Sequence, residues 1–196
     1  MKRAALGFSV HSGWAVLVAV AIDERFPLLL VRERPHLVNT FTFEFRQPYH
    51  TAEKKPLDEA RDFIAQLRRE AGSLADHAVQ SVHATLKRFD YELKSSGHLA
   101  SSAKALPELP RILASHALIH TADGELFRDA LLDASKRHGI ATMIIKESEV
   151  LERAAEALQL SLAELQGRLA ALGRLHGSPW TRDEKLATLV ACLSLL

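Results

Sequence analysis

The sequence is poor in residues that often mark a specialised site. It has a single cysteine among 196 residues, which excludes an internal disulfide and any metal site built on several cysteines. Because Cys192 has apolar neighbours, we expect it to be a small core residue rather than a nucleophile. Aromatic residues make up only 6% of the chain, and 25 basic residues nearly balance 24 acidic ones. The net charge of +1 gives no sign of the basic excess typical of nucleic-acid-binding domains.

Long hydrophobic runs are also missing. The apolar run of residues 14–22 is shorter than the roughly 20 residues needed to cross a bilayer. His11, Ser12 and Gly13 interrupt the region that a secretory signal would need to keep apolar. We therefore interpret the run as a buried strand, and we expect a cytoplasmic protein with no membrane partner. What is present, 47% hydrophobic and 25% charged residues, predicts one soluble globular domain over residues 1–196.

Strand patterns dominate the beginning of the chain. Residues 4–10 and 14–22 are apolar and flank a short connection, which predicts a hairpin, and residues 26–32 follow as a third strand after a charged turn. Three phenylalanines alternate with polar residues over 40–46, a period of two that is typical of a half-buried strand.

The middle of the chain changes to a helical period. Apolar residues recur every three or four positions over 57–93, which predicts one long amphipathic helix or two helices broken at Gly72-Ser73. A helix of that length usually packs across a sheet or against a partner, so we expect a homo-oligomer or a protein partner to bind through it. Residues 95–110 contain Gly97, Pro107 and Pro110, and we expect a flexible loop or linker there.

The second half is mainly helical, with two short strands. We expect strands over 117–121 and 140–145, with a helix between them that begins at Asp123-Gly124. A strand, a helix and a strand so closely spaced imply a parallel pair with a right-handed crossover. Further helices follow from residue 148, and two capping boxes open the last ones, formed by Ser161 with Glu164 and by Thr181 with Glu184. The predicted fold class is α/β, a mixed sheet with antiparallel hairpin strands first and parallel strands after, flanked by helices.

This order of elements resembles the ribonuclease H-like superfamily, and its Holliday-junction resolvase branch is the nearest comparison. Residues 6–14 are similar to the opening strand and turn of that branch, and residues 181–187 to its terminal helix, where an acidic pair precedes small apolar residues. Residues 117–121 take the place of its middle strand. The order also resembles the middle domain of release-factor-type translation proteins. Residues 117–128 and 179–181 are similar to uncharacterised bacterial proteins, a match that carries no activity with it.

The resemblance implies a metal-dependent nuclease, but the expected acids are missing. Two-metal phosphodiester cleavage needs several carboxylates around cations about 3.5–4 Å apart. The family pattern has an Asp on the first strand and an acid at the end of the middle strand, where this chain has Ser9 and either His120 or Thr121. The remaining candidates for catalysis all lie at predicted helix starts, where acids also serve as caps: Asp123, Glu125, Asp183 and Glu184.

The ten histidines form no tight ligand motif in the sequence. On a strand, His116 and His120 would share a face but lie about 13 Å apart, too far for one metal. We therefore predict no metal site. Residues at neighbouring strand ends still define a candidate binding pocket, namely Ser9, His11, Ser12, His120 and Thr121.

These patterns favour a ribonuclease H-like domain without catalysis, a pseudoenzyme that acts by binding. Two alternatives remain open. A nuclease with a rearranged acidic site would need a divalent metal held by Asp123, Glu125, Asp183 and Glu184. A translation-associated factor of release-factor type would sediment with ribosomes and need no metal.

Overall fold

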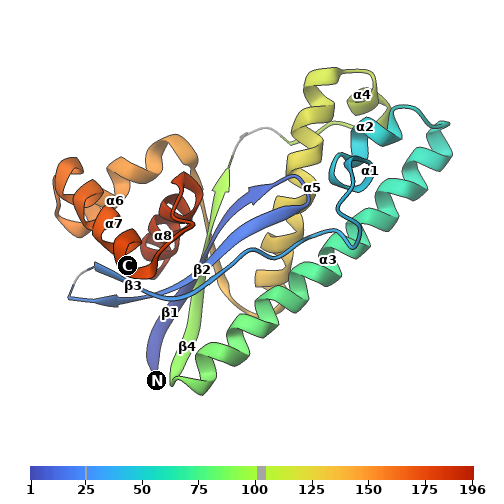
Figure 1. Cartoon of the computed structure of the whole chain (residues 1–196). Coiled ribbons are helices and arrows are strands. Elements are labelled where there is room, and N and C mark those ends of the chain that lie inside the picture. The colour runs from blue at the N-terminus through green and yellow to red at the C-terminus, as the bar shows by residue number, and fades with distance from the viewer. Residues whose placement is uncertain (25, 101–104) are drawn as a thin grey trace.

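A five-stranded mixed sheet forms the centre of the protein. The structure is a computed structural model that describes residues 1–24, 26–100 and 105–196. The strand order is β3-β2-β1-β4-β5; β1 pairs antiparallel with β2 and parallel with β4, β3 is antiparallel to β2, and β5 is parallel to β4. The predicted mixed sheet is therefore confirmed (Figure 1). The strands are β1 (Lys2–His11), β2 (Trp14–Asp23), β3 (Phe26–Glu33), β4 (Tyr91–Ala100) and β5 (Ala141–Lys146).

Helices cover both faces of this sheet. One face carries α3 and α5, which pack on each other and on β4 and β1, and the other carries α8, with α6 and α7 outside it (Figure 1). Two short helices, α1 and α2, lead from β3 into α3. None of the helices in the described part of the chain is long and apolar enough to cross a membrane. The helices are α1 (Phe43–Arg46), α2 (Pro48–Ala52), α3 (Leu57–Arg88), α4 (Leu109–Leu113), α5 (His116–Arg137), a 3₁₀ turn (Glu147–Glu149), α6 (Val150–Leu158), α7 (Leu162–His176) and α8 (Arg182–Leu195).

Two glycines let α8 lie directly on the sheet. Gly7 on β1 pairs with Gly97 on β4, so the two stand side by side in the sheet. A Cβ at Gly7 would overlap the Ala187 carbonyl of α8, and one at Gly97 would overlap the Val190 carbonyl. The missing side chains are therefore what brings the backbone of α8 against the central strands.

The fourth strand was missed by the sequence patterns. The helix α3 is continuous through Gly72 and ends at Arg88, Asp90 turns the chain with a φ of 62°, and residues 91–100 form β4. The prediction that residues 95–110 form a loop is therefore wrong for 95–100, while 101–104 lie outside the described residues. Ser95, Ser96 and Gly97 are poor strand formers, but pairing with β1 and β5 on both sides overrides that local preference.

Two predicted strands are helical. The residues 40–46 contain α1, where Arg46 N–H donates to the Thr42 carbonyl, and the alternating phenylalanines lie mostly on the surface. The residues 117–121 belong to α5, which already begins at His116. Its buried residues recur at helical spacing from the start of the helix, so the 3.6-residue period and not the short apolar run decides the structure: Ile119, Ala122, Leu126, Phe127, Ala130, Leu131 and Ala134.

The apolar stripe of α3 is used inside the molecule. The side chains of Ala60, Ile64 and Leu67 are buried, as are those of Ala71 and Val79 further along. This stripe packs against α5 and β4 as part of the core between the helices and the sheet. The sequence-based expectation that a partner binds through residues 57–93 therefore loses its apolar basis, because the outward face of α3 is mostly polar.

Candidate functional site

Ser9, His11 and Asp183 meet where the carboxyl end of β1 faces the start of α8. The Ser9 hydroxyl donates to Asp183 Oδ1 over 3.0 Å, and His11 Nε2 lies 3.1 Å from Asp183 Oδ2. Trp14 stacks on the His11 ring, with centroids 4.4 Å apart. Ser9 is buried, whereas His11 and Asp183 are partly exposed. This part of the predicted pocket is thus assembled around a single carboxylate.

Glu184, the second acid of α8, forms an ion pair with Arg34. The Glu184 side chain has no exposure, and its Oε1 accepts from Arg34 Nη2 at 2.6 Å and from Nε at 3.2 Å. Its other oxygen accepts from the backbone N–H and the hydroxyl of Thr181, which completes the predicted capping box. Burial alone would raise the pKa of Glu184, but the hydrogen bonds from Thr181 and Arg34 outweigh it and lower that pKa. Glu184 is a structural anion with its acceptor capacity largely used.

The middle strand brings no carboxylate to this place. Phe8 pairs with His98, so the register places Leu99 beside Ser9 on the face that α8 covers. His98 points to the other face, where it stacks on Phe8 and lies 3.0 Å from the Ser96 hydroxyl. Burial lowers the pKa of His98 to about 4, which keeps the ring neutral. The residue of β4 beside Ser9 is therefore Leu99, while the predicted His120 and Thr121 lie on α5, and none of the three is an acid.

The predicted site residues of α5 lie in different surroundings from those of β1. His120 contacts His116 and His50, and the Thr121 hydroxyl donates to the Ala117 carbonyl one turn earlier in the helix. Asp123 is buried and accepts from Tyr49 N–H and from His50 of α2. The Glu125 carboxylate is 3.0 Å from Arg128. The premise that residue 120 ends a strand next to β1 is wrong, because residues 116–137 are helical.

Ser12, another residue of the predicted pocket, lies in the turn between β1 and β2. The Ser12 carbonyl accepts from Arg46 Nε at 3.2 Å, and Gly13 turns the chain with a φ of 83°. This contact ties the hairpin tip to α1. Within the described residues, Ser12 thus contributes to the position of the turn.

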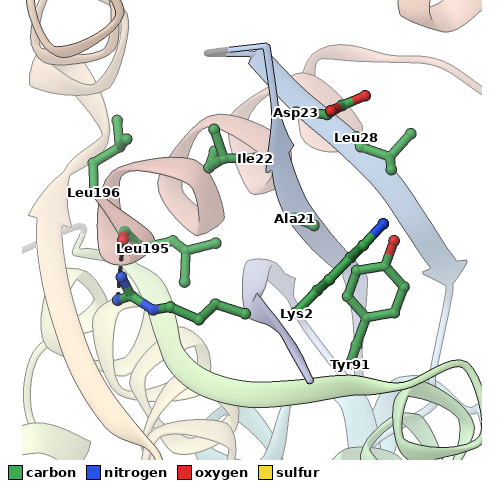
Figure 2. A pocket seen from close by; sticks show the side chains of 9 residues that line it. Lys2, Ala21, Ile22, Asp23, Leu28, Tyr91, Leu195 and Leu196 are labelled. Carbon is green, nitrogen blue, oxygen red and sulfur yellow. Dashed lines mark hydrogen bonds between the residues drawn. The ribbon is translucent and has the colours of Figure 1, made fainter.

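A cavity of about 590 Å³ lies at the opposite end of the central strands (Figure 2). It opens beside the amino ends of β1 and β4, where Lys2, Asp23 and Tyr91 line it together with the aliphatic side chains of Leu28 and Leu195. Arg3 closes one wall by donating to the Leu195 carbonyl. The cavity is separate from the Ser9 cluster, which lies near the carboxyl end of β1. Ligand clefts of parallel strands usually form at those carboxyl ends.

The sheet order and the terminal helix define the fold class. A sheet with the order 3-2-1-4-5, an antiparallel first hairpin and a terminal helix across β1 is a ribonuclease H-like fold. The RuvC structure of Thermus thermophilus is similar over 96% of this chain and 91% of that chain, with a TM-score of 0.54 and 14% identity. The structure of T. thermophilus RuvC in complex with Holliday junction substrate matches 97% of this chain and 91% of that chain, with a TM-score of 0.51 and 12% identity. No protein-family model matches the sequence, and no curated protein matches it.

Sequence reasoning missed two partners in these sites. Arg34 reaches Glu184 across 150 positions of the chain, and His50 reaches Asp123 across 73. Arg34 lies just after β3, beyond the predicted strand of residues 26–32, and was not among the predicted site residues. For His50 the only local signal was Pro48, which is typical of the first position of a helix and so indicates the short helix that carries His50.

Proposed function

We propose that this chain is a ribonuclease H-like binding module that does not cleave nucleic acid at its strand ends. One observation carries the proposal: Asp183 and Glu184, the two acids of α8 nearest Ser9, already have protein partners. Ser9 and His11 contact Asp183, while Arg34 and Thr181 hold Glu184. The neighbour of Ser9 on β4 is Leu99, which has no carboxylate. Two cations cannot be bound by a single partly exposed carboxylate, because their charge would remain uncompensated.

The nuclease alternative would need Asp123, Glu125, Asp183 and Glu184 around one cation. Asp123 is engaged by His50 and Tyr49 on α2, and Glu125 lies beside Arg128. In the part of the chain that the structure describes, none of these acids belongs to a group of three or more residues that could hold a metal. The geometry therefore favours binding over cleavage.

A second copy of the chain is the partner that we propose. The strand β5 ends the sheet order, and its side away from β4 pairs with no other described strand. Ile144 is 57% exposed and Met143 38%, so apolar side chains flank an open row of backbone donors and acceptors. Such an edge is a template for another strand. The other edge strand, β3, contains Pro27, which lacks a donor and discourages pairing.

The experiment has one arm for each half of this proposal. A four-way DNA junction and a single-stranded oligonucleotide are incubated with the protein and either Mg²⁺ or Mn²⁺, and we expect no products. Light scattering on the protein alone, from the same preparation, should give a mass near twice 21.7 kDa. Metal-dependent cleavage that disappears in Asp183→Asn would overturn the non-catalytic half, and a mass of one chain at all concentrations would overturn self-association.

A further inference from the structure

Three histidines from two helices meet on the side of the molecule that carries α2 and α5. His116 and His120 are one turn apart on α5, so their side chains share a face, and their Nε2 atoms are 3.1 Å apart. His50 of α2 joins them, its ring centroid 4.5 Å from that of His120. One nitrogen from each ring lies within 4.8 Å of the others. The 13 Å separation expected for a strand does not apply, because the segment is helical.

A buried carboxylate orients the third ring. His50 Nδ1 is 2.5 Å from Asp123 Oδ2, and Asp123 Oδ1 accepts from the Tyr49 backbone N–H at 2.7 Å. Asp123 is only 2% exposed and lies on α5 one turn after His120. A carboxylate behind one nitrogen of an imidazole fixes the ring and its tautomer and leaves the other nitrogen free as a ligand. His50 therefore presents Nε2 away from Asp123.

We infer that His50, His116 and His120 form a binding site for a divalent transition metal of the zinc class, with Asp123 as the carboxylate that positions His50. Zinc binds imidazole nitrogens at about 2.0–2.1 Å, so two ligands of a tetrahedral ion are roughly 3.3 Å apart. The His116–His120 pair is already near that spacing, and one nitrogen of the His50 ring lies within 4.8 Å of theirs. The nitrogen-only ligand set favours zinc, cobalt or nickel over magnesium or calcium, which prefer oxygen.

The site is open on one side. His116 and His120 are exposed, and His50 is only partly buried, so an ion can enter from solvent. Three protein ligands leave a fourth position for water or another ligand, unlike the closed four-ligand sites that only stabilise a fold. The ion would also join α2 to α5. This inference does not rest on the proposed binding function, since the site is separate from both the Ser9 cluster and the β5 edge.

Metal binding is tested on the untagged full chain, because a histidine tag would bind the same ions. We expect one Zn²⁺ per chain by calorimetry, and a visible absorption band of four-coordinate cobalt when Co²⁺ is the probe. His116→Ala and His120→Ala should each weaken zinc binding at least ~10-fold, since each removes one of three ligands. Asp123→Asn should weaken it ~10–100-fold, the usual effect of removing a carboxylate behind a ligand histidine.

The control is His77→Ala, which removes an exposed helical histidine of α3 outside the cluster. It should bind zinc as the wild type does. The two α5 ligands are exposed, so their alanine variants keep the core, and circular dichroism verifies their folding. Failure of the wild type to bind one zinc per chain would overturn the site. So would unchanged affinity in His120→Ala, or a cobalt spectrum that is identical in wild type and His116→Ala.

Discussion

Glu184, a predicted candidate for catalysis, is a buried acid that stabilises the fold. Its side chain has no exposure, and Arg34 is the cation that compensates it. Replacing one partner of a buried pair leaves an unpaired charge, which typically costs 3–5 kcal/mol. Arg34 is 40% exposed, so water screens part of that cost. We expect Arg34→Met to lower the free energy of unfolding by about 2 kcal/mol, measured by urea denaturation at pH 7.

An exposed pair elsewhere provides the control for Arg34. Arg153 lies 2.7 Å from Glu149 one helical turn away, with both side chains partly exposed. Arg153→Met should change the free energy of unfolding by no more than about 0.5 kcal/mol. An equal effect of the two substitutions would mean that Glu184 is not held as a buried anion. Because the folded pKa of Glu184 is lowered, its contribution is present above its ordinary value of about 4.5 and is lost as pH falls through the folded pKa.

His98 also makes the stability depend on pH, but as a buried base, whereas Glu184 is a buried acid. Burial lowers its pKa from 6.5 to about 4, so between these values the unfolded chain binds a proton that the folded chain excludes. Stability is therefore complete above pH 6.5 and falls as pH decreases toward 4, by about 1.4 kcal/mol per unit. His98→Gln should remove this slope, seen as a flatter plot of unfolding free energy between pH 6.5 and 4.5. Parallel plots for the two proteins would contradict a neutral buried His98.

At the residue scale, the sequence predicted what is local and missed what is distant. The capping box of Thr181 and Glu184 follows from a spacing of three, and the structure confirms it. The role of Arg34 depends on a contact across 150 positions, which no local pattern encodes. The same holds for His50, whose contact with Asp123 needs α2 folded against α5. Residues brought together by the fold alone account for most of what was missed.

At the level of elements, the contact of α8 with the sheet depends on Gly7 and Gly97. An alanine at position 97 would place its Cβ on the Val190 carbonyl, which cannot move without displacing the helix. Overpacking of this kind costs 1–3 kcal/mol. We expect Gly97→Ala to destabilise the protein by about 2–3 kcal/mol, measured as a shift of the urea midpoint at constant slope.

The same substitution on α7 should act in the other direction. Gly167 lies inside that helix with nothing within 4 Å of an added Cβ. Alanine has the higher helix propensity by about 0.8–1 kcal/mol, so Gly167→Ala should stabilise the protein by up to about 1 kcal/mol. If Gly97→Ala did not lower the stability, α8 would not be packed directly on the backbone of β4.

Elements with a strong period were predicted and elements shaped by their neighbours were not. The hairpin of β1 and β2 and the long helix α3 follow from patterns that extend over ten residues or more. By contrast, β4 contains Ser95 and Gly97 on the face that α8 covers, where the Ser95 hydroxyl lies 3.1 Å from that of Ser194 and Gly97 leaves room for the helix backbone. Because small residues are common in loops, the sequence pattern predicted a linker over residues 95–100, which form most of β4.

At the scale of the whole molecule, the fold separates its candidate sites. The Ser9 cluster lies between β1 and α8, the histidine cluster between α2 and α5, and the 590 Å³ cavity at the amino ends of β1 and β4. The predicted pocket combined residues of the first two because 117–121 was taken for a strand beside β1. The fold class was nevertheless predicted correctly. The strand beside β1 is β4, residues 91–100, and not the predicted strand 117–121, but the sheet is still mixed and still resembles the ribonuclease H-like fold.

The self-association that we propose through β5 concerns the whole molecule and can be tested with a single side chain. Two copies of β5 placed antiparallel would exchange backbone hydrogen bonds about a two-fold axis and cover the exposed Ile144 and Met143. Lysine at position 144 puts like charges close together across that axis and adds charge to an edge, a device that natural edges use against pairing. Ile144→Lys should weaken dimerisation at least ~10-fold, a change of about 1.4 kcal/mol, measured by sedimentation equilibrium. Leu175→Lys, at a 77% exposed site on α7, should leave the dimer intact; a dimer that survives Ile144→Lys and dissociates with Leu175→Lys would place the interface on α7 instead.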